Sequence, residues 1–146
     1  MITCIIHIYL LLTPINQDVK YVVAEYHQLT TEQAEINFIN KHSQNSDPSV
    51  AAYVLSISMK QAEYTYNPYE KIRIFKFNEK MLNQLINQNQ SNVHLRYVRL
   101  IAQENAPRFL GYNNHLEEDK YFLNKILLAS DESDYLDAYI RANTSL

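Results

Sequence analysis

The scarcity of glycine restricts the fold of this chain more than any other feature of its sequence. Gly111 is the only glycine among 146 residues, and the chain has four prolines. Tight turns between strands depend on residues that adopt positive φ, so this composition argues against a sheet of many short strands. The content of 47% hydrophobic and 20% charged residues is that of an ordinary globular protein. We therefore predict an almost entirely helical chain.

The same scarcity restricts the classes of function. Phosphate-binding loops, dinucleotide-binding fingerprints and nucleophile elbows need two or more glycines at fixed spacing, and one glycine excludes their usual forms. The five histidines lie far apart in the sequence, and Cys4 is the only cysteine, so no spacing typical of a metal site is present. We predict no catalytic residue, no cofactor and no metal ligand.

The most complete helix signal lies in the stretch Ser91 to Tyr112. Ser91 is a suitable N-cap for a helix that continues to about Asn105, and Pro107 should end it. Gly111 follows at the place where a positive φ is expected. Apolar residues form two adjoining faces of this helix, which indicates that it is mostly buried.

Arg96, Arg99 and Gln103 form the only polar stripe on this helix. Two arginines on a buried helix need carboxylate partners, because an unpaired charge in an apolar interior is strongly unfavourable. Asp119 is the expected partner, since the helical pattern places it on an inward face while the two glutamates before it point elsewhere. We predict a structural ion pair of Asp119 with Arg99 or, alternatively, with Arg96 or Arg108.

Capping residues and apolar periodicity predict six further helices. The expected segments begin at Asp18, Thr30, Asp47, Asn67, Asn114 and Glu132, and they end near Leu29, His42, Tyr66, Ile86, Ala129 and Asn143. The predicted fold class is all-α, with six or seven short helices in antiparallel hairpins. These hairpins could form a compact bundle or a short repeat-like stack.

The distribution of charge along the chain is uneven. Residues 60–110 carry eight basic and four acidic side chains, whereas both flanking segments are acidic and the whole chain has a net charge of −3. We interpret the basic middle as packing against acidic flanks. A nucleic-acid partner is not predicted, because such proteins usually have a domain-wide basic excess.

Tyrosine is unusually frequent, with 12 residues. Tyr64, Tyr66 and Tyr69 surround a predicted loop, and Arg108 and Tyr112 are expected nearby. Because tyrosine is enriched at protein interfaces, these five residues are the candidate surface for a protein partner. The alternative is a set of half-buried tyrosines at the rim of a small domain, with no partner.

One set of residues in the middle of the chain resembles a pattern known from other proteins. The matching positions are Asn67, Pro68, Lys71, Asn92, Arg96, Arg99, Leu100, Gln103, Asn105, Pro107, Phe109, Leu110, Gly111, Tyr112 and Asp119. Over about residues 50–128 the chain resembles an uncharacterised family of small, all-helical, tetratricopeptide-like proteins from Gram-negative bacteria. Gln90 departs from the repeat pattern, which favours proline there. The resemblance implies a helical fold and carries no activity.

The apolar run from Ile2 to Leu12 is too short to cross a bilayer as a helix, so no transmembrane span is predicted. Three interpretations of residues 1–14 remain: a signal peptide shortened by a misplaced start codon, a buried first helix, or a weak membrane tether. The family resemblance favours the first, because its members often begin with a secretion signal. The protein would then be periplasmic or exported, and otherwise cytoplasmic. Residues 15–146 are expected to form a single helical domain.

Three hypotheses for the function follow from this sequence. The first is a noncatalytic helical protein-interaction or scaffold domain. The second is a binder of a small molecule or lipid in a cavity between helices. The third is an enzyme with an unfamiliar Arg/Asp/Tyr site. An apolar cavity would favour the second, and perturbed carboxylates converging with arginines in an open cleft would favour the third.

Overall fold

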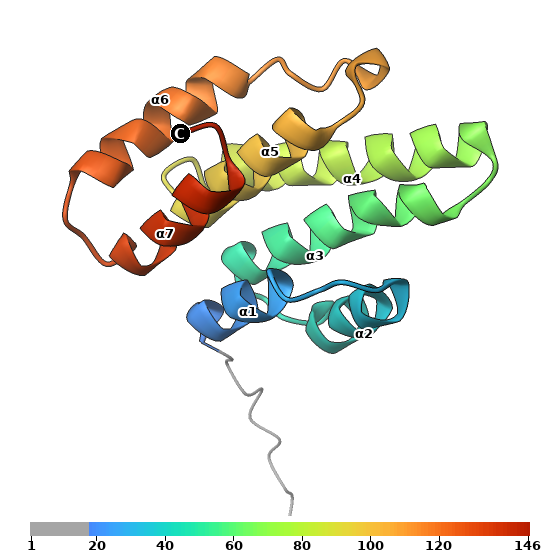
Figure 1. Ribbon diagram of the computed structural model, residues 1–146, viewed down its shortest axis with the longest axis horizontal. Helices are drawn as coiled ribbons and strands as arrows, with labels where there is room; N and C mark the ends of the chain where they lie inside the picture. Colours follow the sequence, from blue (N-terminus) through green and yellow to red (C-terminus); the bar gives the residue numbers. More distant parts are fainter. Residues whose placement is uncertain (1–17) are drawn as a thin grey trace, which may run out of the picture.

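The computed structural model describes residues 18–146, and this part of the chain is all-α (Figure 1). Its helices are α1 (Val19–Tyr26), α2 (Glu32–His42), α3 (Pro48–Lys60), the 3-10 helix η1 (Gln61–Tyr64), α4 (Pro68–Gln88), α5 (Val93–Asn105), the 3-10 helix η2 (Arg108–Leu110), α6 (Leu116–Leu128) and α7 (Asp134–Asn143). The predicted fold class is confirmed. No helix in residues 18–146 is long and apolar enough to cross a membrane. The three interpretations of residues 1–14 concern a segment outside the described residues.

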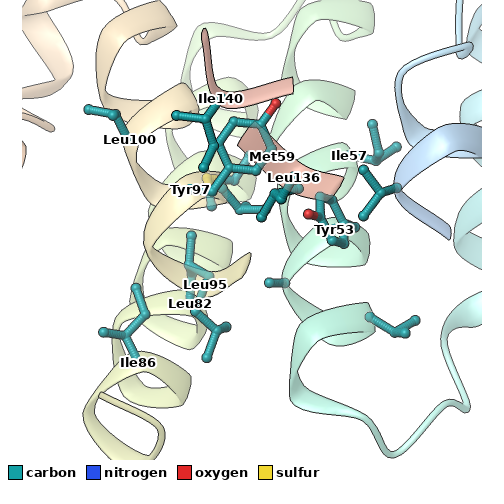
Figure 2. Packing of buried hydrophobic residues seen from close by; sticks show 14 of the residues in the cluster. Tyr53, Ile57, Met59, Leu82, Ile86, Leu95, Tyr97, Leu100, Leu136 and Ile140 are labelled. Carbon is teal, nitrogen blue, oxygen red and sulfur yellow. The ribbon is translucent and has the colours of Figure 1, made fainter. Parts of the chain in front are cut away.

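Consecutive helices from α3 to α7 fold back on one another as antiparallel hairpins, and α1 and α2 lie against α3 (Figure 1). Helix α5 is enclosed most fully, since eight of its thirteen residues are buried. Buried side chains of α3, α4, α5 and α7 converge on a shared core, as Figure 2 shows. Tyr53 of α3 and Tyr97 of α5 are among its largest members, and both are inaccessible to solvent.

Several helix starts lie where their capping residues predict them. The side chain of Asp47 accepts a hydrogen bond from the Ser49 amide at 2.8 Å, and that of Asn67 accepts one from the Tyr69 amide at 3.0 Å. In both cases proline occupies the first helical position, where its missing N–H has no cost. The side chain of Asp18 caps α1 by accepting a hydrogen bond from the Lys20 amide.

Two predicted caps are wrong by one residue. Asn92, not Ser91, caps α5, with its Oδ1 accepting from the Leu95 amide at 3.3 Å. The side-chain Nδ2 of Asn92 also donates to Ser49 Oγ at 3.0 Å, so this position is additionally held by a contact with α3. Thr31, not Thr30, caps α2. In each pair both residues have the chemistry of a cap, so sequence preference alone does not choose between them.

Other boundaries differ from the prediction as well, and the first helix ends at Tyr26 instead of near Leu29. The third helix, expected to continue to about Tyr66, ends as an α-helix at Lys60 and continues as η1. The last two helices begin two residues later than predicted, at Leu116 and Asp134. The carboxylate of Asp134 accepts from the Asp131 amide at 2.7 Å, which holds the preceding residues in a turn.

Gly111 is the one residue with positive φ in the described part of the chain, at 63°. It ends η2 in the left-handed conformation that glycine adopts without steric cost. The chain reverses here between α5 and α6, so α6 packs back along α5 (Figure 1). The predicted position and conformation of this turn are confirmed.

Candidate functional site

The predicted ion pair lies between α5 and α6. Arg99 donates from Nε to Asp119 Oδ2 and from Nη2 to Asp119 Oδ1, both at 2.7 Å. Arg96 Nη1 donates to the same Oδ1 at 3.1 Å. Asp119 is fully buried and Arg99 is 2% exposed. Two parallel bonds of this kind are the strongest geometry available to an arginine and a carboxylate.

Glu118 also joins this network, which corrects the expectation that it points elsewhere. One of its oxygens accepts from Arg96 Nη1, and the other lies 2.9 Å from His115 Nδ1 and 3.7 Å from Arg99 Nη2. The bond from Arg96 and then that from His115 hold the pKa of Glu118 below its ordinary value. Helical spacing gave the direction of the Cβ atom, but a long side chain at the helix end can turn back toward α5.

The remaining polar atoms of the network are satisfied by neutral side chains. Gln103 donates from Nε2 to Asp119 Oδ2 at 2.9 Å, and its Oε1 accepts from the His115 amide at 2.9 Å. Asn83 of α4 accepts from Arg99 at 3.3 Å. Both arginines therefore have carboxylate partners, so the geometry does not support an anion-binding role for them. Arg108 lies on η2, is exposed and contributes no ion pair within residues 18–146.

A groove of about 580 Å³ lies on another side of α5. Its walls are the C-terminal half of α3 with η1, the first two turns of α4, and the end of α5 with η2. Twelve apolar residues line it: Ile57, Met59, Ala62, Pro68, Ile72, Phe75, Ile101, Ala102, Ala106, Pro107, Phe109 and Leu110. Phe109 and Ile72 are 79% and 42% exposed, so apolar surface is left open to solvent at the groove.

Polar groups gather where α1 and α3 meet at this groove. The hydroxyl groups of Tyr26 and Ser56 lie 2.9 Å apart, and Lys60 is one turn beyond Ser56 on α3. Lys60 Nζ lies 2.6 Å from a carboxylate oxygen of Glu35, which is fully buried on α2. This contact raises the pKa of Lys60, so the ammonium form persists at neutral pH. Gln61 donates to the other Glu35 oxygen at 2.8 Å.

The predicted partner surface divides into exposed and buried parts. Tyr66 is fully exposed, Tyr69 is 84% exposed and Tyr64 is 38% exposed. Tyr112 is only 4% exposed and does not belong to such a surface. Its ring packs edge-on against Phe75 with centroids 5.6 Å apart, because the turn at Gly111 directs it toward α4.

Phe109 is the most exposed large apolar residue of the groove, and the sequence interpretation did not assign it to a surface. In the sequence, Phe109 is one of the positions that carry the family resemblance. Its exposure could have been predicted from its position, because an apolar side chain on a short segment between two turns has few neighbouring residues to cover it. The groove also brings it together with Ile72 and Ala102, which lie in different helices.

Two histidines explain part of the tyrosine content. The ring of His94 bonds Tyr53 through Nδ1 at 2.8 Å and Tyr135 through Nε2 at 2.7 Å, and burial lowers its pKa to about 4. His27 bonds the Tyr97 hydroxyl at 2.9 Å and stacks on the Tyr139 ring. These contacts tie α7 to the core. In residues 18–146 no group of three or more His, Cys, Asp or Glu side chains is arranged to hold a metal ion.

Comparisons with family models, curated proteins and solved structures found no match for this chain. The resemblance to a tetratricopeptide-like bacterial family therefore remains a prediction that rests on the residues quoted for it.

Proposed function

We propose that the chain is a noncatalytic protein-interaction domain whose groove binds an apolar segment of a partner protein. The observation that carries this proposal is the mostly apolar lining of the groove, in which Phe109 and Ile72 are exposed to solvent. Pro68 forms part of another wall, and the exposed Tyr66 and Tyr69 are close to it in the sequence. Contiguous exposed apolar surface of this kind is typical of interaction sites.

The aromatic rim supports a protein partner over a small ligand. A small molecule is mostly enclosed by its pocket and makes little use of side chains beyond the mouth. A protein segment can fill the groove and also cover Tyr66 and Tyr69, whose rings offer apolar area and a hydroxyl group.

A small apolar molecule or lipid is the second candidate for the same groove. Its support is the volume of about 580 Å³, which falls within the range of roughly 300–1,000 Å³ common for small-molecule sites. The third hypothesis, an enzyme with an Arg/Asp/Tyr site, has less support. The arginines and Asp119 neutralise one another below the surface, where a substrate has no access.

A displayed library of random peptides, selected against the full chain, tests the proposal. We expect enrichment of peptides with several apolar residues. Their affinity should fall about tenfold or more in Ile72→Ser, since a buried isoleucine side chain contributes on the order of 2 kcal/mol to binding. Ile36→Ser is the matched control, because Ile36 is 36% exposed on α2 and lies outside the groove.

Equal losses in the two variants, or no enrichment at all, would contradict the proposal. Dodecanoate separates the two candidate ligands. If it binds the wild type, loses affinity in Ile72→Ser and no peptide competes with it, the groove is a small-molecule site. If selected peptides bind and displace it, the protein-interaction function stands.

A further inference from the structure

The groove is not uniform, because three of its six polar lining residues lie together on α1 and on one face of α3, whereas Glu63, Lys71 and Asn105 lie singly on η1, α4 and α5. Ser56 and Lys60 are four residues apart on α3 and therefore share a face, and the Tyr26 hydroxyl reaches Ser56 from α1. The rest of the groove, toward Ile101 and Phe109, is mostly apolar. In Figure 1, α1 lies below α3, whereas the η2 segment lies at the opposite edge of the molecule.

We propose that the polar end of the groove, formed by Tyr26, Ser56 and Lys60, binds one acidic side chain next to the apolar stretch of the bound segment. This inference rests on the proposed function and specifies the chemistry of the partner. It also gives the bound segment a direction, with its acidic residue toward α1 and its apolar residues toward η2.

Hydrogen-bond donors are in excess at this end. A lysine ammonium has three donors, and Glu35 occupies one side of Lys60, whose side chain is 42% exposed. Tyr26 and Ser56 each have one hydroxyl hydrogen, and the bond between them uses only one of these. The other hydrogen is available to a ligand. A carboxylate accepts several hydrogen bonds and donates none, so it complements this set of donors.

The charges around the groove favour one acidic residue over several. Lys60 and Lys71 both line it, and Glu63 is the only acidic side chain among the lining residues. Lys71 is exposed and forms no ion pair with another residue of the described chain. Glu35 lies out of solvent contact and is already committed to Lys60 and Gln61. Glu63 would repel a second carboxylate placed beside η1.

The test uses a peptide selected on the wild-type chain and its variant with Glu or Asp replaced by the amide. The acidic peptide should bind the wild type about tenfold more tightly than the amide peptide, as expected for loss of a charge-assisted hydrogen bond. The preference should disappear in the double variant Glu35→Gln with Lys60→Met, which leaves no unpaired carboxylate in the interior. Lys71→Met, on the α4 wall, is the matched control and should keep most of the preference.

Tyr26→Phe gives an independent readout, because it removes a hydroxyl group without changing any charge. It should weaken binding of the acidic peptide more than binding of the amide peptide, because a hydrogen bond to a charged carboxylate is stronger than one to a neutral amide oxygen. Selected peptides without an acidic residue, or a preference that survives Glu35→Gln with Lys60→Met, would overturn the inference. In either case, if Ile72→Ser still weakens peptide binding, the proposed function stands and only the inference about the acidic residue is rejected. If Ile72→Ser has no effect on binding, both are rejected.

Discussion

The ion-pair network and the polar end of the groove contain similar groups but have opposite relations to solvent. Between α5 and α6, Arg99 and Asp119 are buried and use their charges on each other, with Gln103 and Asn83 completing the contacts. At the groove, Lys60 also has a buried carboxylate partner but keeps an exposed face. A cation whose donors are all used within the chain stabilises the fold, whereas one with donors left over can bind a ligand.

The tyrosines repeat this difference. Tyr97 is inaccessible to solvent and its hydroxyl bonds His27 and the Tyr139 carbonyl oxygen. Tyr66 and Tyr69 are almost entirely exposed, on either side of the groove residue Pro68 in the sequence. The same residue type therefore serves the core in one region and an accessible surface in the other, and burial distinguishes the two roles.

The largest expected effect on stability comes from removing one partner of the buried ion pair. Arg99→Met and Asp119→Leu should each lower the free energy of unfolding by about 3–5 kcal/mol, because each leaves a buried charge without its main partner. The double variant should lose less than the sum of the two, which urea unfolding of all four proteins will measure. Additive losses would mean that Arg99 and Asp119 do not stabilise each other. The contrast between a buried structural ion pair and the partly exposed Lys60 at the groove would then be wrong.

A second effect should appear in the dependence of stability on pH. The pKa of His94 is about 4 in the folded chain, against an ordinary value of 6.5, because burial disfavours the charged ring. Between pH 4 and pH 6.5 the unfolded state binds more protons than the folded state. The stability that the folded chain gains by keeping His94 neutral is therefore complete above pH 6.5 and is lost as the pH falls toward 4. The loss approaches about 3 kcal/mol.

His94→Gln is the control for this effect, since glutamine offers a donor and an acceptor but does not titrate. Its free energy of unfolding should depend less on pH than that of the wild type between pH 4 and 6.5. Parallel curves for the two proteins would show that His94 titrates normally and that its contacts with Tyr53 and Tyr135 do not exclude the charged form.

The smallest effect on stability is expected at the groove. Phe109→Ser should change the free energy of unfolding by less than about 0.5 kcal/mol, because the side chain is 79% exposed. The same substitution should weaken binding of the selected peptides. Phe77→Ser is the matched control, with 63% exposure on α4 outside the groove, and should leave binding unchanged. A large loss of stability in Phe109→Ser would assign Phe109 to the core.

Features that depend on neighbouring residues were predictable from the sequence. The Asp47-Pro48 and Asn67-Pro68 helix starts follow from which backbone groups lack partners in a first turn. The positive φ of Gly111 follows from its place between two helices. The pairing of Arg99 with Asp119 was also predictable, because a short turn brings consecutive helices together and leaves few ways to neutralise a buried cation.

Features that join distant parts of the chain were decided by the tertiary structure. The groove combines residues from Tyr26 to Leu110, and His27 reaches Tyr97 across 70 positions. Tyr112 was assigned to the surface and is buried, because its periodicity and chemistry are the same whether or not α4 lies beside it. The sequence by itself determined, to within two residues, where helices begin, and also where the chain turns and which charges need partners. The packing of the helices decided which of those surfaces stay open, because exposure depends on the neighbours that every other helix supplies.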